Sequence, residues 1–187
     1  MFIVLEGIDG CGKSTQAKLL VEWLERNEKK VFLTAEPTKN EIGLFIRDIL
    51  SGNEKVDPKT LALLFTADRY EHIVNEIEPA LSRNEIVISE RYYHSTITYQ
   101  EAQGVDRKWL LEINKFARKP DITIFLDVKP EISVKRTTTN EIFERKEFLE
   151  KVRDNYLKLD ENMKKIDANR SKDEIVNDIK NIVSGLI

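Results

Sequence analysis

The chain has 187 residues, of which 41% are hydrophobic and 34% charged, and its formal net charge is -3. This composition is too apolar for a disordered segment and has no long apolar run, so it predicts a soluble globular protein and no membrane partner. The slightly acidic balance excludes a uniformly basic surface, so no nucleic-acid partner is expected.

Cysteine and histidine content narrows the function classes further. The single cysteine, Cys11, excludes an intramolecular disulfide, and His72 and His94 lack the spacing of a zinc site and are interpreted as incidental. No basic region of a signal peptide precedes the first apolar run. We therefore expect a cytoplasmic protein that forms a single domain over residues 1–187.

Short apolar runs rich in β-branched residues predict parallel strands buried on both faces. In chain order they span residues 2–5, 31–34, 86–89 and 122–128, and a fifth, shorter candidate lies near 165–168. Such strands, alternating with helices, predict an α/β fold with a parallel sheet covered on both faces. Ligands of these folds bind at the carboxyl ends of the strands.

Helices are predicted where apolar residues recur at the spacing of one helical face. The first such face lies within residues 17–24, directly after the first strand, and the stretch 41–83 is expected to be mostly helical. A later face is formed by Phe148, Val152, Tyr156, Leu159, Met163 and Ile166. The last is formed by Ile175, Val176, Ile179, Ile182, Val183 and Leu186.

Residues 7–14 match G-x-x-x-x-G-K-[ST], the phosphate-binding P-loop, between the first strand and an amphipathic helix. Its backbone N–H groups, the helix dipole and the Lys13 charge would hold the phosphates of ATP, with Cys11 as a small filler of the turn. The expected ATP contacts from this loop are Gly7, Ile8, Asp9, Gly10, Cys11, Gly12, Lys13, Ser14 and Thr15.

A P-loop alone leaves GTPases, ATPase motors and kinases open, so the accompanying motifs decide. The guanine motif N-K-x-D is absent. The chain instead carries Glu36-Pro37, an arginine at 47, Phe65-Thr66-Ala67-Asp68-Arg69, and a run from Glu90-Arg91 to Gln100. With Glu6-Gly7-Ile8-Asp9-Gly10, these motifs resemble those of the thymidylate kinase family over nearly the whole chain.

The resemblance implies the phosphorylation of dTMP to dTDP by ATP and Mg²⁺, a step of dTTP biosynthesis. It also implies a P-loop kinase fold of three layers, a five-stranded sheet in the order 2-3-1-4-5, and a homodimer. Residues 36–104 would form the acceptor-binding region, and residues 136–147 a short lid.

The residue types fit a thymidylate pocket. Phe65 offers a ring face on which a base can stack, and Arg69 follows one helical turn later, where it can donate to a base carbonyl. Arg47 and Arg91 can clamp the acceptor phosphate, and the Gln100 amide can pair with the thymine edge. By the resemblance, the expected dTMP contacts are Glu36, Arg47, Phe65, Arg69, Arg91, Ser95, Thr96, Tyr99 and Gln100.

Phosphoryl transfer depends on placement and charge neutralisation, and the acceptor phosphate is already ionised, so no catalytic base is assigned. Ser14 and Glu90 are expected at the magnesium ion, and Asp127, which also ends a strand, is expected to stabilise the following turn. The expected catalytic residues are Lys13, Arg91, Asp9 and Arg145.

The assignment of Arg145 rests on a missing charge. Some members of the family carry an arginine inside the P-loop, whereas here residues 9–12 contain no basic side chain. The lid must then supply the cation, and Arg145 is expected at the transferring phosphoryl group, with Arg136 nearer the adenine of ATP.

Two other functions remain open at this stage. The first is a small P-loop kinase with another monophosphate or a deoxynucleoside as acceptor, which would share the cradle and the lid. The second is a nucleotide-dependent switch that binds ATP without an acceptor, against which the acceptor-side arginines argue.

Overall fold

The computed structural model describes residues 1–136, 143, 145–159 and 163–187. Its centre is a five-stranded sheet in the order β2-β3-β1-β4-β5, with every neighbouring pair parallel. The strands are β1 (Phe2–Glu6), β2 (Val31–Ala35), β3 (Ile86–Glu90), β4 (Ile122–Asp127) and β5 (Met163–Asp167). The expected parallel sheet and its order are confirmed.

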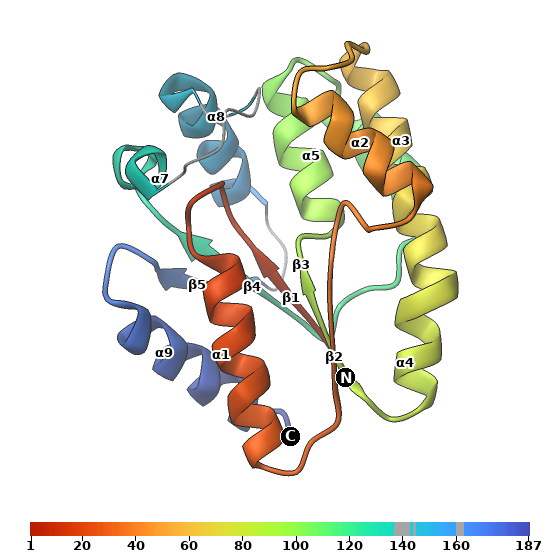
Figure 1. Ribbon diagram of the computed structural model, residues 1–187. Coiled ribbons are helices and arrows are strands. Elements are labelled where there is room, and N and C mark those ends of the chain that lie inside the picture. Colours follow the sequence, from red (N-terminus) through yellow and green to blue (C-terminus); the bar gives the residue numbers. More distant parts are fainter. Residues whose placement is uncertain (137–142, 144, 160–162) are drawn as a thin grey trace.

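The helices of the described residues cover both faces of this sheet. Figure 1 shows α1 and α9 side by side on one face and α3, α4 and α5 on the other. The helices are α1 (Lys13–Arg26), α2 (Glu41–Leu50), α3 (Pro58–His72), the π-helical turn η1 (Ile73–Ile77), α4 (Glu78–Ser82), α5 (Tyr93–Ala102), α6 (Arg107–Ile113), α7 (Pro130–Arg136), α8 (Lys146–Leu157) and α9 (Lys172–Ser184). The three-layer α/β fold is therefore confirmed.

Strand burial differs between the centre and the edges of the sheet. Every residue of β1 is buried, and only the last residues of β3 and β4 are partly open. By contrast, β2 is at best half-buried, and Lys164 and Lys165 of β5 are exposed. The expectation of strands buried on both faces is wrong for these two edge strands. An edge strand has one neighbour only, and its exposed lysines discourage pairing with another chain.

The boundary between α8 and β5 corrects a second expectation. The apolar face that begins at Phe148 was expected to continue helically to Ile166, but α8 ends at Leu157. Met163 and Ile166 lie in β5, where they pair in register with Thr123 and Leu126 of β4. Met163 and Ile166 are three residues apart, a spacing that also fits one face of a helix. The spacing of apolar residues therefore could not distinguish a strand here from a continuation of α8.

Polar residues set the helix starts. The side chains of Asn40, Asp57 and Asp106 accept hydrogen bonds from N–H groups of the first turns of α2, α3 and α6. Ser171 and Glu174 form a capping box at the start of α9. Each cap satisfies backbone donors that have no partner inside the helix.

The stretch from 41 to 83 is mostly helical, as expected, because α2, α3, η1 and α4 fill it. Of these, α2 lies beyond the carboxyl ends of the strands, where the acceptor-side residues were expected, and α4 leads back to the amino end of β3. Within the described parts of the chain, no helix has the length and apolar character that crossing a membrane requires.

Candidate active site

The residues after β1 form a tight loop that runs directly into α1. Gly7 has φ +146°, and a Cβ there would lie 2.7 Å from both the Cys11 Sγ and the Leu126 carbonyl oxygen, so only glycine fits. The Lys13 Nζ folds back and donates to the carbonyl oxygens of Gly7 at 2.9 Å and Ile8 at 3.0 Å. This closed loop at a helix N-terminus is a geometry that binds phosphate groups.

Cys11 lies under this loop. Its side chain is 1% exposed and belongs to the main hydrophobic core. This burial agrees with the interpretation of Cys11 as a small residue that fills the turn.

Ser14 and Glu90 bring two oxygen atoms together beside the loop. The Ser14 hydroxyl, in the first turn of α1, donates at 2.5 Å to the carboxylate of Glu90, the last residue of β3. The other strand-ending acid, Asp127, accepts two hydrogen bonds from Arg153 of α8, at 2.6 and 3.1 Å. Asp127 thus holds α8 through Arg153 and is not a second acid next to Ser14.

Arg91 follows β3 and reaches back to the loop. Its backbone has φ +70°, in the left-handed region that a residue with a side chain rarely adopts. Its Nη1 donates to the Gly7 carbonyl oxygen at 3.2 Å and to the Ser95 Oγ at 2.8 Å. Its Nη2 donates to the Asp9 carboxylate and, at 3.2 Å, to the Tyr99 hydroxyl. Arg91 therefore links the P-loop to α5.

The Arg91–Asp9 pair remains ionised although both side chains are largely removed from solvent, with 16% and 25% of their surfaces exposed. Burial opposes the charge of Arg91, but the negative charge of Asp9 raises the arginine pKa well above its ordinary value. Burial likewise raises the pKa of Asp9, but the charges of Arg91 and Lys13 outweigh it and hold this pKa below its ordinary value. The site therefore contains a fixed cation at neutral pH.

Glu6, the last residue of β1, supports the turn that carries Arg91. Its carboxylate is fully buried and accepts from the backbone N–H groups of Tyr92 at 2.8 Å and Ser95 at 3.2 Å. It also accepts from the hydroxyls of Ser95 and Tyr156, each at 2.7 Å. Tyr92, the residue just before α5, forms no capping hydrogen bond with its own side chain. Glu6 therefore caps α5 from the neighbouring strand.

Arg69 is a second arginine held by several protein groups and, unlike Arg91, it is fully buried, with 1% of its surface exposed. Its Nη2 donates to Glu36 at 2.6 Å and to the Thr96 hydroxyl at 2.9 Å. Its Nη1 donates to the Asn114 side chain at 2.5 Å. Arg69 thus donates three hydrogen bonds to residues of three separate segments, and these bonds fix the plane of its guanidinium group.

His72 extends this network to β2. Its Nδ1 lies 3.1 Å from the Glu36 carboxylate, and its Nε2 lies 2.7 Å from the Thr34 hydroxyl. The imidazole is fully buried. The interpretation of His72 as incidental is therefore wrong, because it holds Glu36 from the side opposite Arg69.

These groups surround one cavity of about 670 Å³, within the size range of about 300–1,000 Å³ that is usual for small-molecule sites. All the expected dTMP contacts line it. One of them is Arg47, whose Nη2 donates to the Pro37 carbonyl oxygen. The predicted residues that line the cavity are Asp9, Gly10, Gly12, Lys13, Ser14, Thr15, Glu36, Arg47, Phe65, Arg69, Glu90, Arg91, Ser95, Thr96, Tyr99, Gln100 and Arg136.

The remaining predicted residues lie elsewhere. Gly7, Ile8 and Cys11 are buried behind the loop surface, so at most their backbone atoms face a ligand. Arg145 is exposed at the residue before α8 and is not among the cavity-lining residues that the structure describes. Most of the expected lid, residues 137–142 and 144, lies outside the described residues.

Several residues of the site carried no functional prediction. Glu6 belonged to a motif but was given no role of its own. Its place at the end of an apolar strand was a usable signal, because a buried acid is almost always paired. Phe143 lines the cavity and stacks on Phe148 with ring centroids 5.0 Å apart. Asn114 gave no sequence signal, because its contact with Arg69 joins residues 45 positions apart.

Comparison with known proteins agrees with this geometry. The family model described as thymidylate kinase matches residues 5–179. A probable thymidylate kinase of Methanocaldococcus jannaschii is 46% identical, over 97% of this chain and 97% of that protein. One from Pyrococcus horikoshii is 45% identical, over 97% of this chain and 95% of its own. One from Thermococcus kodakarensis is 44% identical, over 100% and 98%. The chain therefore belongs to the thymidylate kinase family.

Proposed function

We propose that this protein transfers the γ-phosphoryl group of ATP to dTMP and releases ADP and dTDP. A P-loop for the donor and a set of acceptor-side arginines line the same cavity. Family membership supports the kinase reaction, and the chemistry of the acceptor side supports the choice of base.

The observation that carries the choice of thymine is a pair of unsatisfied polar atoms. The Arg69 Nε and the Gln100 Oε1 are both buried, and neither has a partner among the described residues. Both residues line the cavity, together with Tyr92, whose unpaired hydroxyl can donate or accept. Buried polar groups of this kind are costly unless a ligand satisfies them.

The donor of Arg69 and the acceptor of Gln100 match the edge of thymine. Thymine offers an acceptor at O4 and a donor at N3–H, whereas cytosine offers a donor at N4 and an acceptor at N3. A cytosine would leave both protein groups unsatisfied. Phe65, half-buried in the cavity wall, supplies the stacking face.

The acceptor phosphate would lie at the basic end of the cavity. Arg91 and Arg47 line this region, and the Asp9 carboxylate orients Arg91. Glu36 and Tyr99 flank the space between base and phosphate and would contact the sugar, beside the hydroxyls of Ser95 and Thr96. Arg136, also a wall residue, would lie nearer the adenine of ATP.

Catalysis then depends on position and charge. The acceptor phosphate is ionised at neutral pH, so no side chain has to remove a proton before attack. Lys13 would neutralise the β- and γ-phosphates, and Arg91 would offset the repulsion between the two anions. The adjacent oxygens of Ser14 and Glu90 suit Mg²⁺, directly or through its waters. When bound, that ion would neutralise charge on the phosphates of ATP.

The decisive experiment is a coupled ADP-release assay across a panel of acceptors. We expect dTMP to be turned over with the highest kcat/KM, and dUMP less well, because a single methyl group in an apolar pocket is worth only about 1–3 kcal/mol. Faster turnover of thymidine, UMP or AMP would assign another acceptor. ATP binding with no dTMP binding in calorimetry would assign the nucleotide switch instead.

A homodimer is part of the same proposal. Large apolar side chains are exposed on one side of the helical region: Leu63, Tyr70 and Val74 are at least half exposed and recur along one face of α3 and η1. The Tyr70 ring contacts that of Phe116, which is 43% exposed. A contiguous apolar patch of this kind is typical of a subunit interface.

Light scattering of the purified protein tests the dimer. We expect twice the mass of one chain, and the mass of a single chain in a Leu63→Lys variant. A wild-type mass of one chain would overturn the homodimer. The single-domain organisation and the cytoplasmic location expected from the sequence stay predictions.

A further inference from the structure

We propose that Asn114 is a positioning residue that fixes the Arg69 guanidinium group for recognition of the acceptor base. The inference rests on the proposed function, because it concerns how the pyrimidine edge is recognised. Asn114 is not among the residues that line the cavity, and it follows α6, a helix that packs against α5 and α3.

Arg69 needs a partner on each side to hold one orientation. Glu36 and Thr96 take up Nη2, and Asn114 takes up Nη1 at 2.5 Å. The Arg69 guanidinium also stacks against the Tyr92 ring, 5.4 Å from its centroid. With both terminal nitrogens bound to protein, Nε is the guanidinium nitrogen that has no partner among the described residues. Without Asn114, the group could rotate about its bond to Glu36 and move Nε out of line.

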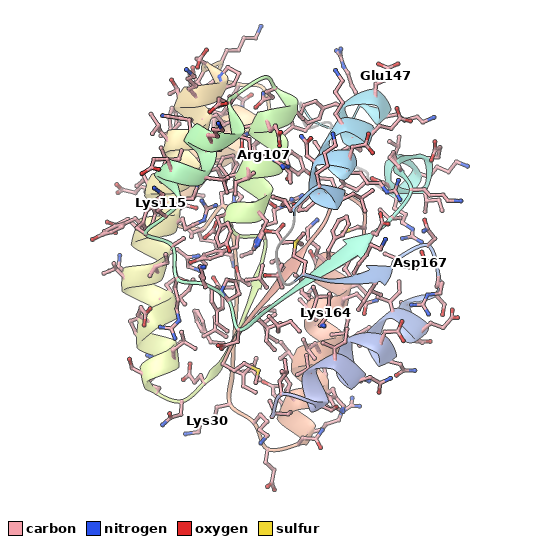
Figure 2. The ribbon with its side chains drawn as sticks, turned by 180° about the vertical axis from the view of Figure 1, so that it is seen from behind. Lys30, Arg107, Lys115, Glu147, Lys164 and Asp167 are labelled. Carbon is pink, nitrogen blue, oxygen red and sulfur yellow. The ribbon has the colours of Figure 1, made fainter. Side chains whose placement is uncertain are left out.

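The Asn114 amide is itself held in a single orientation. Its Nδ2 donates to the Leu110 carbonyl oxygen at 2.8 Å, in the last turn of α6, so its Oδ1 must face Arg69. The residue is 6% exposed. In the view from behind (Figure 2), α6 runs between the labelled Arg107 and Lys115. The end of this short helix thus places one acceptor oxygen against the site.

A neutral acceptor suits this position. Arg69 already has a buried carboxylate partner in Glu36, so the pair is neutral as a whole. A second carboxylate would keep the hydrogen bond to Arg69 at the cost of one more buried charge, so an aspartate should serve less well than the asparagine but better than an apolar residue. An amide supplies the hydrogen bond without adding charge.

The chain contains a matched control for the local role of Asn114. Asn27 follows α1, and its Nδ2 donates to the Trp23 carbonyl oxygen at 2.7 Å, again four residues earlier. Asn27 has the same helix-ending bond but is exposed and does not contact the site. Asn27→Ala therefore reports the cost of losing such a cap alone.

The experiment measures dTMP and ATP separately for three variants. Asn114→Leu keeps the volume but removes both amide contacts. Asn114→Asp keeps an oxygen acceptor towards Arg69 and loses the donor to Leu110. We expect Asn114→Leu to raise the KM and Kd for dTMP about tenfold, the cost of one charge-assisted hydrogen bond, with the values for ATP unchanged. Asn114→Asp should restore dTMP binding to within about threefold of wild type, and Asn27→Ala should change neither substrate.

Two results would overturn the inference: equal losses for dTMP and ATP in Asn114→Leu, or a loss for dTMP in Asn114→Asp as large as in Asn114→Leu. If the leucine variant does not fold, Asn114→Ala tests the same two contacts. Wild-type protein is titrated first, because absence of dTMP binding there refutes the proposed function itself. Wild-type binding with an unaffected Asn114→Leu variant refutes only the role of Asn114.

Discussion

Two arginines of the acceptor side and two of the donor side are held in opposite ways. Arg69 is buried and the Arg91 side chain is 16% exposed, and each makes at least three hydrogen bonds to the protein. Arg136 and Arg145 are exposed, and Arg136 has one long bond, at 3.2 Å, to the Ala168 carbonyl oxygen. Buried, paired cations lose little conformational freedom when a ligand arrives, whereas exposed ones must be ordered. Arg69 and Arg91 are therefore preorganised, whereas Arg136 and Arg145 must be ordered on binding. Each side also has a cation of the other kind, because Arg47 is exposed and the Lys13 Nζ is bound to two loop carbonyl oxygens.

The largest expected effect comes from Arg91→Lys, which keeps the charge but removes the fork of donors. We expect kcat/KM for dTMP to fall about a thousandfold, because a single ammonium group cannot bind Asp9, Ser95 and a phosphate together. Steady-state kinetics at saturating ATP measure it. The lysine charge still faces Asp9, so the melting temperature should stay close to that of wild type. A decrease of less than about tenfold would mean that the acceptor side does not depend on this fixed geometry.

The next largest effect tests the support beneath Arg91. In Glu6→Gln an amide replaces a carboxylate that accepts from two N–H groups and two hydroxyls. We expect a loss of about 2 kcal/mol in the free energy of unfolding at neutral pH, measured by urea denaturation. Because Tyr92 and Ser95 hold the Arg91 turn, kcat/KM for dTMP should fall as well. Asp121→Asn is a control, since Asp121 accepts from the Phe2 N–H at 2.7 Å, at the other end of β1.

The Glu6 effect should depend on pH. Burial raises the pKa of Glu6, but the hydrogen bond from His94 and the charge of Arg91 outweigh it and hold the pKa below the ordinary value of 4.5. A lowered pKa stabilises the fold above 4.5, and this contribution is lost as pH falls through the folded-state pKa. The difference between wild type and Glu6→Gln should therefore shrink as pH falls below 4.5. A constant difference would show that the carboxylate charge is not what stabilises the turn.

The fold was largely predictable, because alternating apolar runs and helical faces define an α/β sheet. The strand order, however, came from the family resemblance, since periodicity does not say which strands are neighbours. The errors lie where tertiary contacts decide. Lys164 and Lys165 are exposed because β5 is an edge strand, and Met163 is in a strand because it pairs with Thr123.

The candidate site, like the fold, contains residues that the sequence predicted and residues that only tertiary contacts identify. Residues expected to contact phosphates or the base belong to contiguous motifs, such as those around Lys13, Arg69 and Arg91, and the structure places these three in the lining of one cavity. Residues that hold these groups come from distant elements, and Asn114 and His72 are examples. Their roles depend on which side chains meet in the interior, and no spacing along the chain records this.

On the donor side, Arg145→Ala tests the predicted lid cation. We expect kcat at saturating ATP to fall about tenfold with the KM for dTMP unchanged, because the group would act only on the transferring phosphoryl. Arg145 is exposed, so its removal should not alter the free energy of unfolding. An unchanged kcat removes Arg145 from the mechanism.

The smallest effect is expected for Arg136→Ala. Arg136 lines the cavity at the end of α7 and donates to the Ala168 carbonyl oxygen, so it bridges to the segment after β5. An exposed cation of this kind contributes less than about 1 kcal/mol, so we expect the KM for ATP to rise about threefold with kcat unchanged. Lys135→Ala, at the exposed neighbour outside the cavity lining, is the control. If kcat instead fell in Arg136→Ala and not in Arg145→Ala, the catalytic cation would be Arg136. Arg136 would then join Lys13 as a donor-side cation that already lines the cavity before ATP binds.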